Sequence, residues 1–119
     1  MCHTVGDLSD EEILEFRDVV RVMETAAKNR FGSSHQNVEC LMNHGYRSWP
    51  SVPLVHWHFH PRYIQGKTEF AGLTFVDEDP TESVVGHNSW PAGPEVLEKI
   101  VQAYQEEIRI LLPGATLSH

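Results

Sequence analysis

Apolar residues near the start of the chain recur at spacings of three and four, which is the period of an amphipathic helix. They are Ile13, Phe16, Val20, Met23 and Ala27. Ser9, followed three residues later by Glu12, forms a capping-box pattern, and Phe31-Gly32 is typical of a helix C-terminus. The pattern predicts a helix of about 20 residues, and we interpret its stripe as core.

Three segments favour β-strands because apolar and β-branched residues alternate with polar ones. They are His35–Asn43, Val52–Tyr63 and Thr68–Val76. Loops are expected at Asn43–Pro50 and at Asp77–Pro94, which are rich in Gly, Pro and polar residues. The acidic Asp77-Glu78-Asp79 run within the second loop is expected to be solvated.

A second helix is predicted over Glu95–Leu112, with Pro94 at a first-turn position. Its periodic apolar residues are Val96, Ile100, Ala103, Tyr104, Ile108 and Leu111. The tail from Pro113 is expected to fray. The order helix, three strands, helix predicts an α+β fold with an antiparallel sheet between a long N-terminal and a C-terminal helix.

Composition and charge narrow the function classes. The 119 residues predict one domain, 1–119, with 9 basic against 17 acidic residues and a net charge of −8. This balance argues against broad binding to nucleic acid, although a local phosphate site stays possible. No apolar stretch is long enough to span a membrane and no secretory leader opens the chain, so a cytoplasmic protein is expected. Cys2 and Cys40 make neither a disulfide framework nor a cysteine-type zinc site.

Eight histidines are many for this length, and three of them lie at alternate positions of the second predicted strand. Side chains on a strand alternate between its faces, so Leu54, His56, His58 and His60 would share one face. The apolar residues between them would pack on the core from the other face. These are Val55, Trp57 and Phe59.

Three interpretations of the histidine row stay open. It is a polar outer face that happens to use histidine, or a zinc site, or a set of catalytic imidazoles. A zinc site would need a further ligand from His44, His87 or a carboxylate elsewhere. In the catalytic case, a neutral imidazole attacks phosphorus and carries the nucleotide covalently, while a neighbouring imidazole serves the leaving group.

The segment Leu54-Val55-His56-Trp57-His58-Phe59-His60-Pro61-Arg62 resembles the motif of the histidine-triad nucleotide hydrolases and transferases. That motif reads His-φ-His-φ-His-φ-φ, where φ is apolar, and is usually followed by Pro-Arg. With Pro61-Arg62 as the anchor, His56 matches the second, nucleophilic histidine and His58 the third. Leu54 replaces the first histidine, and His60 falls on a position that is usually apolar.

The resemblance continues upstream without a gap. Asn43-His44-Gly45 matches the family's Asn-x-Gly at its fixed distance from the motif, and Ser51-Val52-Pro53 matches the residues that lead into it. Pro50 stands where the family has Gln. The family's long helix corresponds to the segment that starts near Asp7.

The resemblance implies a nucleoside-phosphate hydrolase or nucleotidyl transferase, acting on a phosphoanhydride or phosphoramidate bond without a metal or cofactor. His56 and His58 are then catalytic, and Asn43 and Ser51 bind the phosphate. Arg47 and His60 are further candidates, while Trp57 is assigned to packing and neither His87 nor Trp90 has a role.

The family usually carries a further segment before its long helix, which holds the base and ribose, and this chain begins almost at the helix. We therefore expect a homodimer that completes or covers a three-stranded sheet with an open edge. The alternative function is a non-catalytic nucleotide-binding or dimeric interaction protein whose triad has degenerated.

Overall fold

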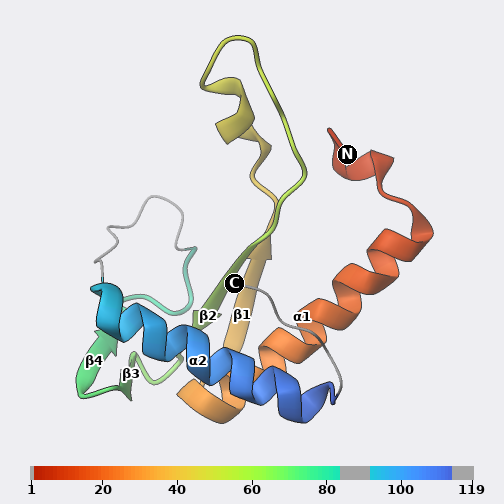
Figure 1. The fold of residues 1–119 in the computed structure, drawn as a ribbon. Coiled ribbons are helices and arrows are strands. Elements are labelled where there is room, and N and C mark those ends of the chain that lie inside the picture. The colour runs from red at the N-terminus through yellow and green to blue at the C-terminus, as the bar shows by residue number, and fades with distance from the viewer. Residues whose placement is uncertain (1, 84–91, 114–119) are drawn as a thin grey trace.

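The computed structural model describes residues 2–83 and 92–113 and has an α+β fold (Figure 1). The long helix α1 spans Asp10–Phe31 and the second helix α2 spans Pro94–Leu111. The strands are β1 (His35–Glu39), β2 (His58–Arg62), β3 (Lys67–Phe70) and β4 (Leu73–Val76). Two single turns of 3-10 helix, η1 (Val5–Asp7) and η2 (Met42–Tyr46), complete the described elements.

Both predicted helices are confirmed, but the stripe of α1 is not core at its N-terminal end, where Ile13 is exposed. The side chain of Ser9 accepts a hydrogen bond of 3.2 Å from the backbone N–H of Glu12, which caps α1. Gly32 ends the helix in the left-handed conformation, with φ of 71°. In α2, the predicted stripe is buried or half-buried along its whole length, from Val96 to Leu111.

The predicted three-stranded sheet is wrong. The described strands form two separate antiparallel pairs, β1 with β2 and β3 with β4. The single strand predicted over Thr68–Val76 is a hairpin, because Ala71 and Gly72, with φ of 52° and 78°, turn the chain between two short strands.

The first pair is also shorter than predicted. β1 ends at Glu39, because the chain then turns into η2, and β2 begins only at His58. Residues 40–57, which we term the arm, lead away from the helices and back (Figure 1). His56 and Leu54 therefore lie before the strand rather than on it. Predictions for His87 and Trp90 and for the last six residues lie outside the described residues.

The core is small and sits where α1 crosses α2. Among the described residues, the buried apolar side chains are Ala26, Ala27, Phe31 and Ala103. The ring of Phe31 lies 4.9 Å from that of Phe70 and 5.1 Å from that of Tyr104, so it joins both helices to the β3–β4 hairpin. At the other end of α1, Phe16 stacks on Trp57 with 4.0 Å between ring centroids. Trp57 therefore packs on α1 at the base of the arm, although its side chain stays 37% exposed and is not part of the core.

None of the helices within 2–83 and 92–113 is long and apolar enough to cross a lipid bilayer.

Candidate active site

The three imidazoles singled out in the sequence form one row at the junction of the arm and β2. The ring centroids of His56 and His58 are 5.1 Å apart and meet edge to face. Those of His58 and His60 are 6.1 Å apart with parallel planes. The row thus persists although His56 lies two residues before the strand begins.

The His56 ring is held by backbone. Its Nδ1 lies 2.8 Å from the carbonyl oxygen of Leu54. A carbonyl can only accept, so Nδ1 carries a proton, and in the neutral imidazole Nε2 keeps its lone pair. His56 is exposed to solvent, and Nε2 is therefore the basic, accessible nitrogen of the ring. Leu54 thus orients the imidazole with its main chain, which its apolar side chain could not do.

His60 lies beside a carboxylate from the neighbouring strand. The antiparallel register sets Glu39 opposite His58 and Asn37 opposite His60. Diagonally across the pair, His60 Nε2 is 3.7 Å from Glu39 Oε1, which is an ion-pair distance rather than a hydrogen bond. The polar face of this hairpin therefore brings His58, His60 and the carboxylate of Glu39 together.

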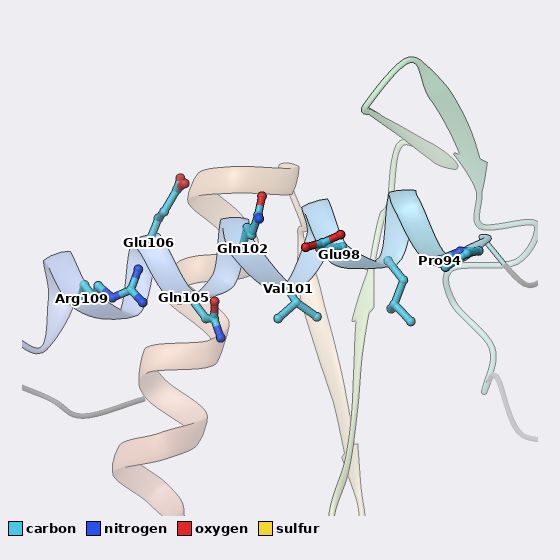
Figure 2. A pocket seen from close by; sticks show the side chains of 8 residues that line it. Pro94, Glu98, Val101, Gln102, Gln105, Glu106 and Arg109 are labelled. Atoms are coloured by element: carbon cyan, nitrogen blue, oxygen red, sulfur yellow. The ribbon is translucent and has the colours of Figure 1, made fainter. Parts of the chain in front are cut away.

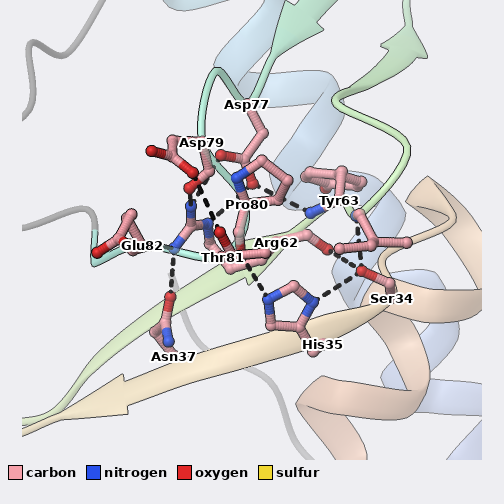
Figure 3. A network of polar contacts seen from close by, with 11 residues as sticks. Ser34, His35, Asn37, Arg62, Tyr63, Asp77, Asp79, Pro80, Thr81 and Glu82 are labelled. Atoms are coloured by element: carbon pink, nitrogen blue, oxygen red, sulfur yellow. Dashed lines mark hydrogen bonds and ion pairs between the residues drawn. The ribbon is translucent and has the colours of Figure 1, made fainter.

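Arg62, at the far end of the same strand, is the hub of a buried polar network (Figure 3). Its side chain is 2% exposed. It donates to Asn37 Oδ1 at 2.7 Å, to the carbonyl of Asp79 at 2.6 Å, and to the carbonyl of Glu82. The guanidinium also pairs with the carboxylate of Asp77. The network fastens residues 77–82 to the β1–β2 hairpin.

This network corrects the prediction of a solvated acidic run at Asp77, whereas Glu78 and Asp79 are exposed as expected. Asp77 is half-buried, because it neutralises a guanidinium that burial would otherwise leave unpaired. Hydrogen bonding to Arg62 holds the pKa of the Asp77 carboxyl below its ordinary value, outweighing burial, and the Tyr63 backbone N–H assists. The same pairing raises the pKa of Arg62.

His35 also attaches residues 77–82 to the β1–β2 hairpin. His35 Nε2 donates to the carbonyl of Pro80 at 2.9 Å, and its Nδ1 lies 2.8 Å from Ser34 Oγ (Figure 3). Sequence reasoning missed both the Arg62 network and His35. The only sequence signal for the network was the Pro-Arg pair at the end of the histidine motif. That pair served to align the motif and was not interpreted as a buried arginine.

The predicted phosphate-binding residues lie on the arm. Asn43, Arg47 and Ser51 are all exposed, and Arg47 Nη1 lies 3.2 Å from His44 Nδ1. Within the described residues, no hydrogen bond links these side chains to the histidine row. These three residues and His56 all lie on the arm.

The close approach of the two sides of the arm at Gly45 gives a physical reason for the glycine of the Asn-x-Gly pattern. The backbone N–H of Val52 donates to the Gly45 carbonyl at 3.1 Å, so the two sides of the arm touch here. A Cβ on Gly45 would lie 2.7 Å from Pro53 Cα and 2.9 Å from the carbonyl oxygen of Val52. Only glycine permits this approach between the two matched segments.

A hollow elsewhere on the surface follows the outer face of α2 (Figure 2). Its lining comes entirely from that helix: Pro94, Leu97, Glu98, Val101, Gln102, Gln105, Glu106 and Arg109. It contains no histidine or cysteine, so the histidine row is the better candidate for chemistry.

A zinc site gains no support from the described residues, because no three His, Cys, Asp or Glu side chains among them are placed to hold one metal ion. The comparisons with known proteins assign nothing further: no family model, no curated protein and no solved structure matches this chain.

Proposed function

We propose that this chain is a nucleoside-phosphate hydrolase or nucleotidyl transferase of the histidine-triad type, with a histidine-triad-like fold and His56 as its nucleophile. The observation that carries the proposal is the 2.8 Å hydrogen bond from His56 Nδ1 to the Leu54 carbonyl. It fixes the tautomer whose Nε2 lone pair is free, and it supplies the orientation that the family draws from a histidine at position 54.

The chemistry follows from that lone pair. His56 Nε2 attacks the phosphorus of a nucleoside phosphate, and a P–N bond forms. The bond from phosphorus to the leaving oxygen or nitrogen breaks, and its electron pair departs with the leaving group, which takes up a proton. Water, or another acceptor in a transferase, then attacks phosphorus and gives up a proton to the imidazole that protonated the leaving group, and the P–N electron pair returns to Nε2. No metal or cofactor is needed in either step.

In this proposal, His58 donates a proton to the leaving group. Its ring lies 5.1 Å from that of His56, so one phosphoryl group can touch both. A histidine is suited to this role, because its ordinary pKa near neutrality lets it donate a proton at physiological pH. Asn43 and Ser51, on the arm, would contact the non-bridging phosphate oxygens.

The test is turnover of a panel of dinucleoside polyphosphates and adenosine phosphoramidates by the full chain. We expect His56→Ala to reduce the rate below about a thousandth of wild type. His60→Ala is the matched control, because it removes a ring from the same row, and most activity should persist. Greater damage from His60→Ala than from His56→Ala would show that the alignment on Pro61-Arg62 is wrong.

The second candidate function is a non-catalytic nucleotide-binding or dimeric interaction protein. It is favoured by the large apolar side chains that stand exposed on the arm, among them Tyr46, Val52 and Trp49, which is 92% exposed. Nucleotide binding without turnover, unaffected by His56→Ala, would select this candidate.

The same exposure supports a homodimer as part of the proposal. A small core, combined with exposed apolar side chains on the arm and on both helices, is typical of a surface that a second chain covers. Cys2 and Cys40 are free thiols, as is usual in a reducing compartment, and a cytoplasmic location belongs to the same proposal.

A further inference from the structure

The carboxylate of Glu39 lies beside the inner part of the histidine row, next to His58 and His60. It faces the same side of the β1–β2 hairpin as His58, its register partner, and lies 3.7 Å from His60 Nε2. Its side chain is 19% exposed, so its charge is less screened than that of a surface glutamate. A substrate that reaches past His58 from His56 therefore meets a negative charge.

No neighbouring cation on β2 offsets this charge. Arg62, at the end of the strand, is paired with Asp77 and bonded to Asn37 and two carbonyls. Among the described residues, His60 is the group at ion-pair distance from Glu39, and only a charged imidazole would neutralise the carboxylate. In order from His56, the polar face then presents the nucleophile and the leaving-group histidine, with the carboxylate of Glu39 beside the latter on β1.

From this order we infer that Glu39 is a specificity-determining residue, which disfavours polyanionic leaving groups and favours neutral or ammonium-bearing ones. The inference rests on the proposed function, in which the leaving group departs on the His58 side. When a phosphoanhydride is cleaved, its leaving group carries two or more negative charges toward Glu39, whereas the amine that leaves a phosphoramidate carries none. Like charges in a partly desolvated site repel, and an ammonium in the same place is attracted.

The experiment compares two substrates on the full chain at about pH 8, above the ordinary pKa of histidine. One is a diadenosine polyphosphate and the other is an adenosine phosphoramidate whose amine part carries an ammonium group. We expect Glu39→Gln to shift the ratio of their kcat/KM values toward the polyphosphate by roughly fivefold or more. Glu69→Gln, which removes the same charge from an exposed site on β3, should leave the ratio unchanged.

An unchanged ratio in Glu39→Gln, or an equal shift in Glu69→Gln, overturns the inference while the role of His56 stands. A second measurement does not depend on turnover: the two compounds are titrated into His56→Ala with and without Glu39→Gln, and the ratio of their Kd values should shift in the same direction. If neither compound is bound or hydrolysed, the inference fails together with the proposed function.

Discussion

Arg62 and Asp77 meet through two nearly parallel hydrogen bonds, from Nε to Oδ2 at 2.8 Å and from Nη2 to Oδ1 at 2.9 Å. Fifteen residues separate the two in sequence, yet the guanidinium is almost fully buried. A bidentate pair of this kind is strong and directional. It ties the segment after β4 to the strand that carries His58 and His60, and so it fixes the inner end of the histidine row.

Asp77→Asn should destabilise the protein by about 3 kcal/mol, because it leaves a buried guanidinium without its counter-charge. Urea unfolding at neutral pH measures this loss. Glu78→Gln is the matched control, since it removes one negative charge from an exposed residue of the same acidic run. Equal effects of the two variants would mean that the ion pair is not the stabilising feature.

The same pair predicts a pH dependence. The folded-state pKa of Asp77 is below the ordinary 3.8, so its contribution to stability is complete above that value. The contribution is lost as the pH falls from there through the lower folded-state pKa. Unfolding free energies measured from neutral to acidic pH should therefore fall more steeply in wild type than in Asp77→Asn below about pH 4. Parallel curves would contradict this assignment.

Gly45→Ala should displace the two sides of the arm, because the new Cβ would meet backbone atoms of Pro53 and Val52 that cannot rotate away. Overpacking of this kind costs about 1–3 kcal/mol. We expect a matching fall in unfolding free energy and a lower kcat/KM in any His56-dependent reaction. Gly6→Ala is the control, since its Cβ would lie 3.8 Å from the nearest side-chain atom, an ordinary contact.

The homodimer can be tested by light scattering at micromolar concentration, where a mass twice the 13.6 kDa of one chain is expected. The physical reason is the exposed apolar surface, together with the open edges that two-stranded sheets leave. A monomer over the whole concentration range would remove the dimer from the proposal.

Metal analysis of the purified protein distinguishes a catalytic role of these histidines from zinc binding by the same histidines. A nucleophilic His56 must keep Nε2 unligated, whereas zinc would occupy that nitrogen. The purified protein should therefore carry no stoichiometric zinc, and a chelator should leave its circular dichroism and its activity unchanged. One zinc per chain, lost together with activity on chelation, would make the zinc interpretation the leading one.

Local signals determined the helices. Ser9, Gly32 and the apolar stripes act within a few residues of themselves, and both helices form where these signals place them. The histidine row could also be predicted from the sequence, since an extended backbone alternates its side chains even just outside a strand. The packing of Trp57 followed from the same alternation.

Tertiary contacts decided the rest. The strands near His56 end early because β1 turns into η2 after Glu39, which removes the partner that residues 52–57 would need. Asp77 looked like part of a solvated acidic loop, because nothing local reveals a buried guanidinium fifteen residues earlier. The Leu54 carbonyl, finally, holds the His56 ring through the main chain. A hydrogen bond to a backbone carbonyl does not depend on which side chain that residue carries. The sequence therefore could not indicate it, and only the folded chain could reveal it.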